Sequence, residues 1–145
     1  KILEEDYKVS ADVWSITSYK ALHRDCLDAE RWNRMHPGDK TRLSYLEQCL
    51  EKESGVYVMA SDYVKALPES IARWFPNPPV ALGTDGFGRS ESREALRDHF
   101  EVDARFIVLG ALGALAREGE IDVAVVTKAM KDLKIDPEKA NPAYL

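Results

Sequence analysis

The sequence predicts an α/β fold, because short apolar runs typical of buried strands alternate with segments of helical periodicity. Residues 56–60 and 80–83 are the two clearest strands, since each apolar run is bounded by glycine, proline or polar residues. Ala11 to Ser18 is predicted to form another strand from its Val, Trp, Ile and Thr residues. A chain of 145 residues, 45% of them hydrophobic, is long enough for one core, so we expect a single domain over residues 1–145.

Helices are expected where apolar residues recur at helical spacing. The opening residues, Lys1 to Tyr7, are typical of the end of a helix already under way, so we expect this chain to be part of a longer protein. Thr41 is the predicted N-cap of one helix, and Pro68 suits the first turn of another. The predicted helices cover residues 22–35, 41–50, 68–75, 92–100, 103–118 and 122–133.

The closing helices carry clear end signals. Asp103 and Asp122 suit N-cap positions, and Gly119 suits a left-handed position after a helix. Leu109 to Leu115 alternates leucine with small residues, a pattern that lets a helix pack closely on a sheet or on a partner helix. Asp136 to Leu145 is predicted to be a polar tail.

Composition narrows the classes of function. The chain has 25 acidic and 20 basic residues, and its net charge of -5 argues against nucleic-acid or anionic-membrane partners. The most apolar run, Phe106 to Ala116, has about half the length that spans a bilayer and is expected to be a buried helix. Cys26 and Cys49 are interpreted as reduced thiols of a cytoplasmic protein.

The stretch from Leu82 to Arg93 (LGTDGFGRSESR) runs from a predicted strand through a glycine-rich turn into a helix. Its glycine spacing fits neither the dinucleotide fingerprint nor a P-loop. Three interpretations remain open. The glycines form a tight turn with positive φ, the loop holds an anion at the helix start, or the loop is an interface patch. The candidate interface or anion-loop residues are Trp32, Asp85, Phe87, Arg89, Ser90 and Arg93.

No residue is predicted to be catalytic, cofactor-binding or metal-binding. Ser90 lacks the G-x-S-x-G context of a nucleophile, so Ser90 or Ser92 is expected to cap the following helix. His23 and Cys26 lie on one helical side, but two ligands do not make a zinc site.

Three segments resemble the C-terminal domain of the homodimeric bacterial type of pyruvate dehydrogenase, which is transketolase C-terminal-like. They are Ser10–Ser18 (SADVWSITS), Glu30–Pro37 (ERWNRMHP) and Leu82–Asp103. The resemblance implies a three-layer α/β/α sandwich with a mostly parallel sheet whose first two strands, one of them central, lie upstream of Lys1. Ser44 stands where the family is expected to have proline, and only a local change in the helix start is expected.

The resemblance also implies a function for the parent protein. It would use thiamine diphosphate and Mg²⁺, bound by other domains, to decarboxylate pyruvate and to acetylate lipoyl groups of the dihydrolipoyl acyltransferase core. The Gly-Asp-Gly…Asn diphosphate motif of such enzymes is missing here, so this domain is expected to be non-catalytic. Its expected role is to support a homodimer and to dock partners. The dimer surface is expected to include Trp32, Phe87, Arg89, Arg93 and the Gly110/Gly113 helix.

Two alternatives of other classes stay open. In one, the chain is a small stand-alone domain that binds a phosphorylated metabolite through the Gly83–Ser90 loop. In the other, it is a docking module that holds the acyltransferase core without any ligand.

Overall fold

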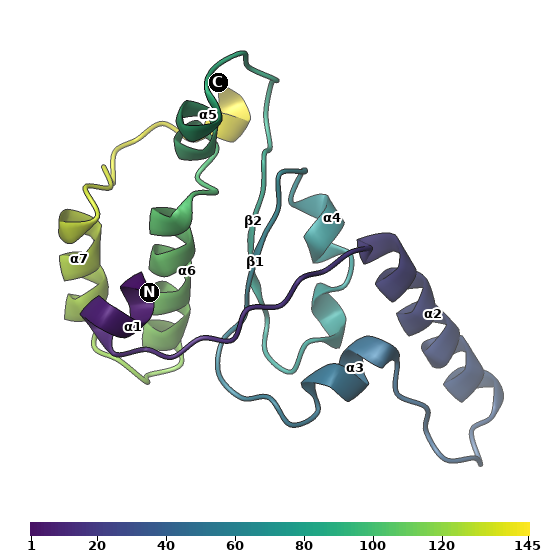
Figure 1. The fold of residues 1–145 in the computed structure, drawn as a ribbon. Coiled ribbons are helices and arrows are strands. Elements are labelled where there is room, and N and C mark those ends of the chain that lie inside the picture. Colours follow the sequence, from purple (N-terminus) through teal and green to yellow (C-terminus); the bar gives the residue numbers. More distant parts are fainter.

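The computed structural model describes all residues from Lys1 to Leu145. Two strands, β1 (Val58–Ala60) and β2 (Val80–Leu82), lie at the centre, with helices on either side (Figure 1). The α-helices are α1 (Ile2–Tyr7), α2 (Tyr19–Met35), α3 (Tyr45–Leu50), α4 (Ala66–Glu69), α5 (Arg93–His99), α6 (Ala104–Arg117) and α7 (Val123–Asp132). Two 3₁₀ turns, η1 (Ala72–Trp74) and η2 (Pro142–Tyr144), complete the structure.

The sheet is parallel and separates two helical layers. Val58 pairs with Val80, and Met59 with Ala81. Because side chains alternate along a strand, Met59 and Ala81 share one face while Val58 and Val80 share the other. Helices α2, α3 and α4 lie on the side of the first face. Helix α6 packs on the second face, and α1 and α7 pack against α6 (Figure 1). The predicted α/β fold is confirmed.

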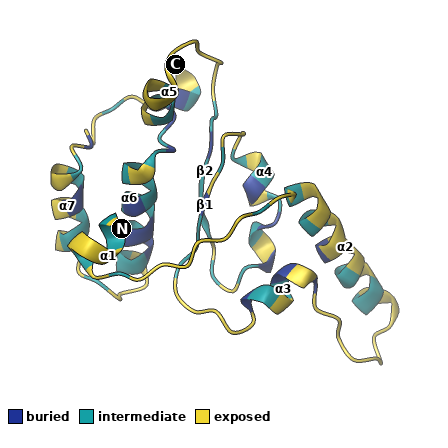
Figure 2. Cartoon of the chain, in the orientation of Figure 1, coloured by how far each residue is buried: buried dark blue, intermediate teal, exposed yellow.

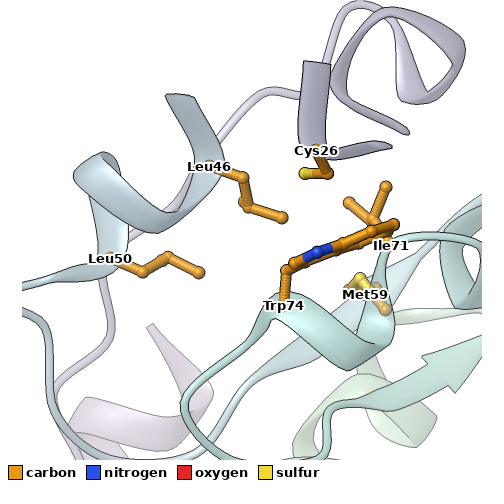
Figure 3. Close-up of a cluster of buried hydrophobic side chains, with 6 residues drawn as sticks. All are labelled: Cys26, Leu46, Leu50, Met59, Ile71 and Trp74. Atoms are coloured by element: carbon orange, nitrogen blue, oxygen red, sulfur yellow. The ribbon is translucent and has the colours of Figure 1, made fainter. Parts of the chain in front are cut away.

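The larger core lies between the sheet and the α2 side. Its six buried residues come from α2, α3, β1 and the α4–η1 segment, and Trp74 lies among them (Figure 3). They are Cys26, Leu46, Leu50, Met59, Ile71 and Trp74. A second cluster of Val108, Leu112 and Ala129 joins α6 to α7, and Ile2, Leu3 and Tyr7 of α1 pack against it. None of the helices combines the length and apolar character needed to cross a membrane.

The predicted strand over Ala11 to Ser18 is wrong. The segment runs extended from α1 to α2, past the sheet, and is mostly exposed (Figures 1 and 2). Val13 is 96% exposed and Trp14 55%, and only Ile16 packs against the larger core. Strand-forming residues make a strand only where a neighbouring edge accepts their hydrogen bonds, and here no strand lies beside them.

The predicted helix over residues 68–75 is also wrong. Pro68 is the third residue of the four-residue α4, and the chain then tightens into η1. The amides of Ile71 and Trp74 donate to the carbonyls three residues earlier, at 3.2 Å in both cases. Residues three apart eclipse in such a turn, which turns both Ile71 and Trp74 into the core.

The cap predictions had mixed outcomes. Asp103 and Asp122 cap α6 and α7 as predicted, and Gly119 has a positive φ of 79°. Thr41 does not cap α3, because Ser44 does. The Ser44 side chain accepts from the Glu47 amide, while the Glu47 carboxylate accepts from the Ser44 amide, which is a capping box. Ser44, which stands where proline was expected, therefore starts α3 itself.

Candidate functional site

The Gly83–Ser90 loop begins where β2 ends. Gly83 is buried, and a Cβ there would lie 2.6 Å from the Tyr63 carbonyl oxygen and 2.8 Å from the Lys65 amide. The next amide, of Thr84, donates a 2.9 Å hydrogen bond to that Tyr63 carbonyl. Glycine is therefore required at position 83 because the backbone that follows β1 passes directly beside it.

Asp85 has a structural role in this loop. Its carboxylate accepts a 3.2 Å hydrogen bond from the Lys65 amide, and the Thr84 hydroxyl donates to the Asp62 carbonyl at 3.0 Å. Arg97 of α5 reaches the Asp62 carboxylate at 3.2 Å. These contacts join the loops after β1 and β2, so the start of the Gly83–Ser90 loop is fixed on that side.

Gly86 adopts the left-handed conformation that one interpretation of the sequence requires. Its φ is +114°, and a Cβ there would lie 2.4 Å from the Pro142 carbonyl oxygen. Gly83 and Gly88 lack positive φ, so the tight turn depends on Gly86 alone.

The remaining loop residues point to solvent. Phe87 is 80% exposed, and Arg89, Ser90 and Arg93 are exposed as well. Ser92, not Ser90, caps α5 by accepting from the Ala95 amide at 3.2 Å. An exposed phenylalanine followed by two exposed arginines is a composition favoured at protein interfaces.

Trp32 lies in a different region, near the end of α2. His36 stacks on its ring at 4.4 Å between centroids, and the Arg42 guanidinium lies 3.7 Å from the ring centroid. The Asn33 side chain closes the intervening turn through hydrogen bonds of 2.8 and 2.9 Å to the backbone of Arg42. The end of α2 and the Gly83–Ser90 loop lie at different ends of the molecule, so the structure does not bring Trp32 to the loop (Figure 1).

The Glu30–Pro37 segment contains a contact that the sequence analysis missed. Glu30 accepts hydrogen bonds from Arg73 Nη2 at 2.6 Å and from Trp74 Nε1 at 2.9 Å. Two partners more than 40 residues away in the chain leave no local pattern, so only the fold reveals them.

Gly110 is not available to a second subunit, which corrects part of the expected dimer surface. A Cβ at Gly110 would lie 3.4 Å from Val80 and 3.8 Å from Val58, so this glycine packs α6 on the sheet. Gly113 has nothing within 4 Å of its Cβ position and remains a candidate.

Burial controls the chemistry of the first cysteine. Cys26 is fully buried, and desolvation is the main cause that raises its thiol pKa. Both cysteines are free, and Cys49 is only partly buried. A buried thiol with a raised pKa is unreactive, so Cys26 acts as a core residue.

Charged side chains line two open hollows away from the loop. One, of about 340 Å³, is lined by Glu47, Glu51, Glu53 and Arg73 among others. The other, of about 590 Å³, is lined by Glu5, Asp6 and Asp132 and also by Lys8 and Lys128.

The side chains of this chain do not form a site for Mg²⁺. No group of three or more His, Cys, Asp or Glu side chains is placed to hold a metal ion. The Asp85 carboxylate already accepts a hydrogen bond from the Lys65 amide.

Comparison with known proteins places the chain in a family. A profile of the transketolase-like TK C-terminal domain matches residues 1–103. The chain is 50% identical over 143 residues to the pyruvate dehydrogenase E1 component of Pseudomonas aeruginosa and 47% identical to that of Escherichia coli K12. The protein of the same name from Mycolicibacterium smegmatis is 39% identical over 139 residues.

These matches cover 98% of the chain for the first two relatives and 96% for the third. The chain spans only 16% of the length of the first two relatives and 15% of the third. The resemblance stated from the sequence is confirmed, and the chain belongs to the transketolase-like C-terminal domain family.

Proposed function

We propose that this chain is the C-terminal domain of a thiamine-diphosphate-dependent pyruvate dehydrogenase. The parent protein would decarboxylate pyruvate and acetylate lipoyl groups of a dihydrolipoyl acyltransferase core in the cytoplasm. The observation that carries this proposal is the 50% identity to a pyruvate dehydrogenase E1 component over 98% of the chain. Thiamine diphosphate and Mg²⁺ would be bound by other domains, since the Gly-Asp-Gly…Asn diphosphate motif is missing from this chain.

The role of the domain would be to support a homodimer and to contact partners through the Gly83–Ser90 loop. Phe87 is 80% exposed, although the hydrogen bonds of Thr84 and Asp85 hold the start of its loop. A large apolar side chain on a fixed backbone loses little conformational freedom on binding, which favours a role as an interface anchor. Arg89 and Arg93 would surround this anchor with hydrogen-bond donors.

The activity is tested on the complete protein, loaded with thiamine diphosphate and Mg²⁺. Carboxyl-labelled pyruvate should release labelled CO₂, and a lipoylated acyltransferase domain should gain an acetyl group. 2-Oxoglutarate serves as the control substrate. Absence of CO₂ release from pyruvate by the loaded protein would contradict the proposal.

The alternative of a phosphometabolite-binding domain has less support from the geometry. Asp85 adds negative charge to the loop, and its carboxylate accepts a hydrogen bond from the Lys65 amide. Titration with a sugar phosphate, comparing the unaltered protein with Arg89→Ala, separates this alternative from the interface role. Saturable binding that the substitution abolishes would favour the metabolite.

A further inference from the structure

The chain after α7 does not end as a free polar tail. The tail runs from α7 across to α5 and ends in η2 beside that helix (Figure 1). The Lys139 ammonium donates hydrogen bonds of 2.6 Å to the Asp98 carbonyl and 3.0 Å to the His99 carbonyl. It also lies 3.5 Å from the Glu101 carboxylate. Carbonyls in the last helical turn attract a cation, so Lys139 anchors the tail to α5.

Three residues beyond this anchor, the tail meets the Gly83–Ser90 loop. Pro142 is buried, and its carbonyl oxygen lies 2.4 Å from the position that a Cβ of Gly86 would occupy. The Asn141 side chain accepts a 2.9 Å hydrogen bond from the Ala143 amide, which fixes η2 and therefore the direction of that carbonyl. Loop and tail thus touch backbone to backbone, in a contact that only glycine allows.

We propose that residues 136–145 act as a strap that holds the Gly83–Ser90 loop in one position. The loop is then fixed on two sides: by the backbone after β1, through Thr84 and Asp85, and by the strap, through Gly86. Lys139 anchors the strap to α5. The contact between Gly86 and Pro142 then restricts the movement of the loop. The consequence that the strap positions Phe87 for a partner rests on the proposed function.

Coupling between the strap and the loop is reciprocal, so a change in either segment should alter hydrogen exchange in the other. The first arm weakens the anchor with Lys139→Met and reads hydrogen exchange of the Thr84 amide in the complete protein, because this loop amide donates a 2.9 Å hydrogen bond to the Tyr63 carbonyl. Lys131→Met is the matched control, because Lys131 is exposed on α7 and makes no ion pair. We expect exchange in the loop to rise about tenfold in Lys139→Met and to stay unchanged in Lys131→Met, as expected for a local opening.

The second arm alters the loop and reads the strap. Gly86→Ala brings a Cβ against the Pro142 carbonyl, whereas a Cβ at Gly88 meets nothing within 4 Å. Gly86→Ala should therefore raise exchange in residues 137–145 about tenfold, and Gly88→Ala should not. Exchange in α6 should stay unchanged if only the strap is released, and it should rise if the whole domain unfolds. In the first arm, Lys139→Arg keeps the positive charge and should return exchange in the loop to the rate of the unaltered protein.

Unchanged exchange in the segment that was not mutated, in either arm, would overturn the proposal. Neither readout requires pyruvate turnover or dimerisation. A negative exchange result therefore does not contradict the proposed function. In the same way, a failure to detect pyruvate decarboxylation or a dimer does not contradict the strap.

Discussion

Trp74 Nε1 donates a 2.9 Å hydrogen bond to the carboxylate of Glu30, across 44 positions of the chain. The indole is buried in the larger core, while the second carboxylate oxygen accepts from Arg73 at 2.6 Å. The Arg73–Glu30 pair is more than a third exposed, and such pairs contribute little to stability. The tie between α2 and η1 therefore depends mainly on the indole hydrogen bond.

Glu30→Ala should destabilise the packing of α2. The substitution leaves the buried Trp74 N–H without an acceptor, which costs about 1–3 kcal/mol. Amide exchange in α2 of the complete protein measures the loss, and Glu30→Gln, which keeps an acceptor oxygen, should lose less. Asp28→Ala is the control, since Asp28 is exposed on the same helix and forms no ion pair. Equal effects of Glu30→Ala and Asp28→Ala would show that the indole bond is unimportant.

Ser44→Ala should destabilise the start of α3 by about 1 kcal/mol, the usual cost of losing an N-cap. Ser44 is 1% exposed, and its hydroxyl and amide both pair with Glu47. Ser44→Pro should cost more than alanine, although the φ of -64° suits proline, because proline also removes the amide that donates to the Glu47 carboxylate at 2.7 Å. Exchange in α3 distinguishes the variants, and a proline variant more stable than the alanine variant would refute this ranking.

Cys49 should react with iodoacetamide before Cys26 in the folded protein. Cys26 is fully buried with a raised pKa, whereas Cys49 is partly exposed. Peptide mass spectrometry after a short exposure at pH 8 measures the two rates, and both thiols should react alike in denaturant. Faster labelling of Cys26 in the folded state would contradict its burial.

The same raised pKa makes stability depend on alkaline pH. The folded state favours the neutral Cys26 thiol, so this contribution is fully present below the ordinary pKa of 9.0 and is lost as pH rises through the higher folded value. Urea unfolding at pH 8 and pH 10, with Cys26→Ala alongside, isolates this contribution. The alanine variant should show a smaller loss of stability between the two pH values, and an identical loss would argue against the linkage.

The two glycines of α6 should respond differently to a large side chain. Gly110→Leu must displace Val80 or α6 itself, and overpacking of this kind costs about 1–3 kcal/mol. Gly113→Leu meets open space within this chain and should leave exchange in the sheet unchanged. Disruption of the sheet by Gly113→Leu, or none by Gly110→Leu, would contradict the packing described here.

Local signals in the sequence predicted the elements whose partners lie nearby. Asp103, Asp122 and Ser92 cap helices because each side chain bonds an amide two or three residues away, which a sequence displays directly. The strands at 58–60 and 80–82 were predicted from apolar runs and observed within those runs.

The misses depend on distant partners. Ala11 to Ser18 has the composition of a strand, but pairing depends on an edge that no local pattern specifies. Likewise, Asp85 was predicted as an interface or anion-loop residue, yet its carboxylate accepts a hydrogen bond from the Lys65 amide, 20 residues earlier. The buried Pro142 in a predicted polar tail follows from contact with Gly86, 56 positions before it in the printed sequence.

The interface role of the Gly83–Ser90 loop is the central claim, and sedimentation equilibrium of the complete protein tests it most directly. Phe87→Ala combined with Arg89→Ala should weaken the dimer by about 2–4 kcal/mol, roughly 30- to 1,000-fold in the dissociation constant. Tyr45→Ala combined with Arg31→Ala removes an exposed tyrosine and an exposed arginine from the α2–α3 side and should leave the dimer intact. An unchanged dissociation constant in the Phe87/Arg89 variant would contradict the account.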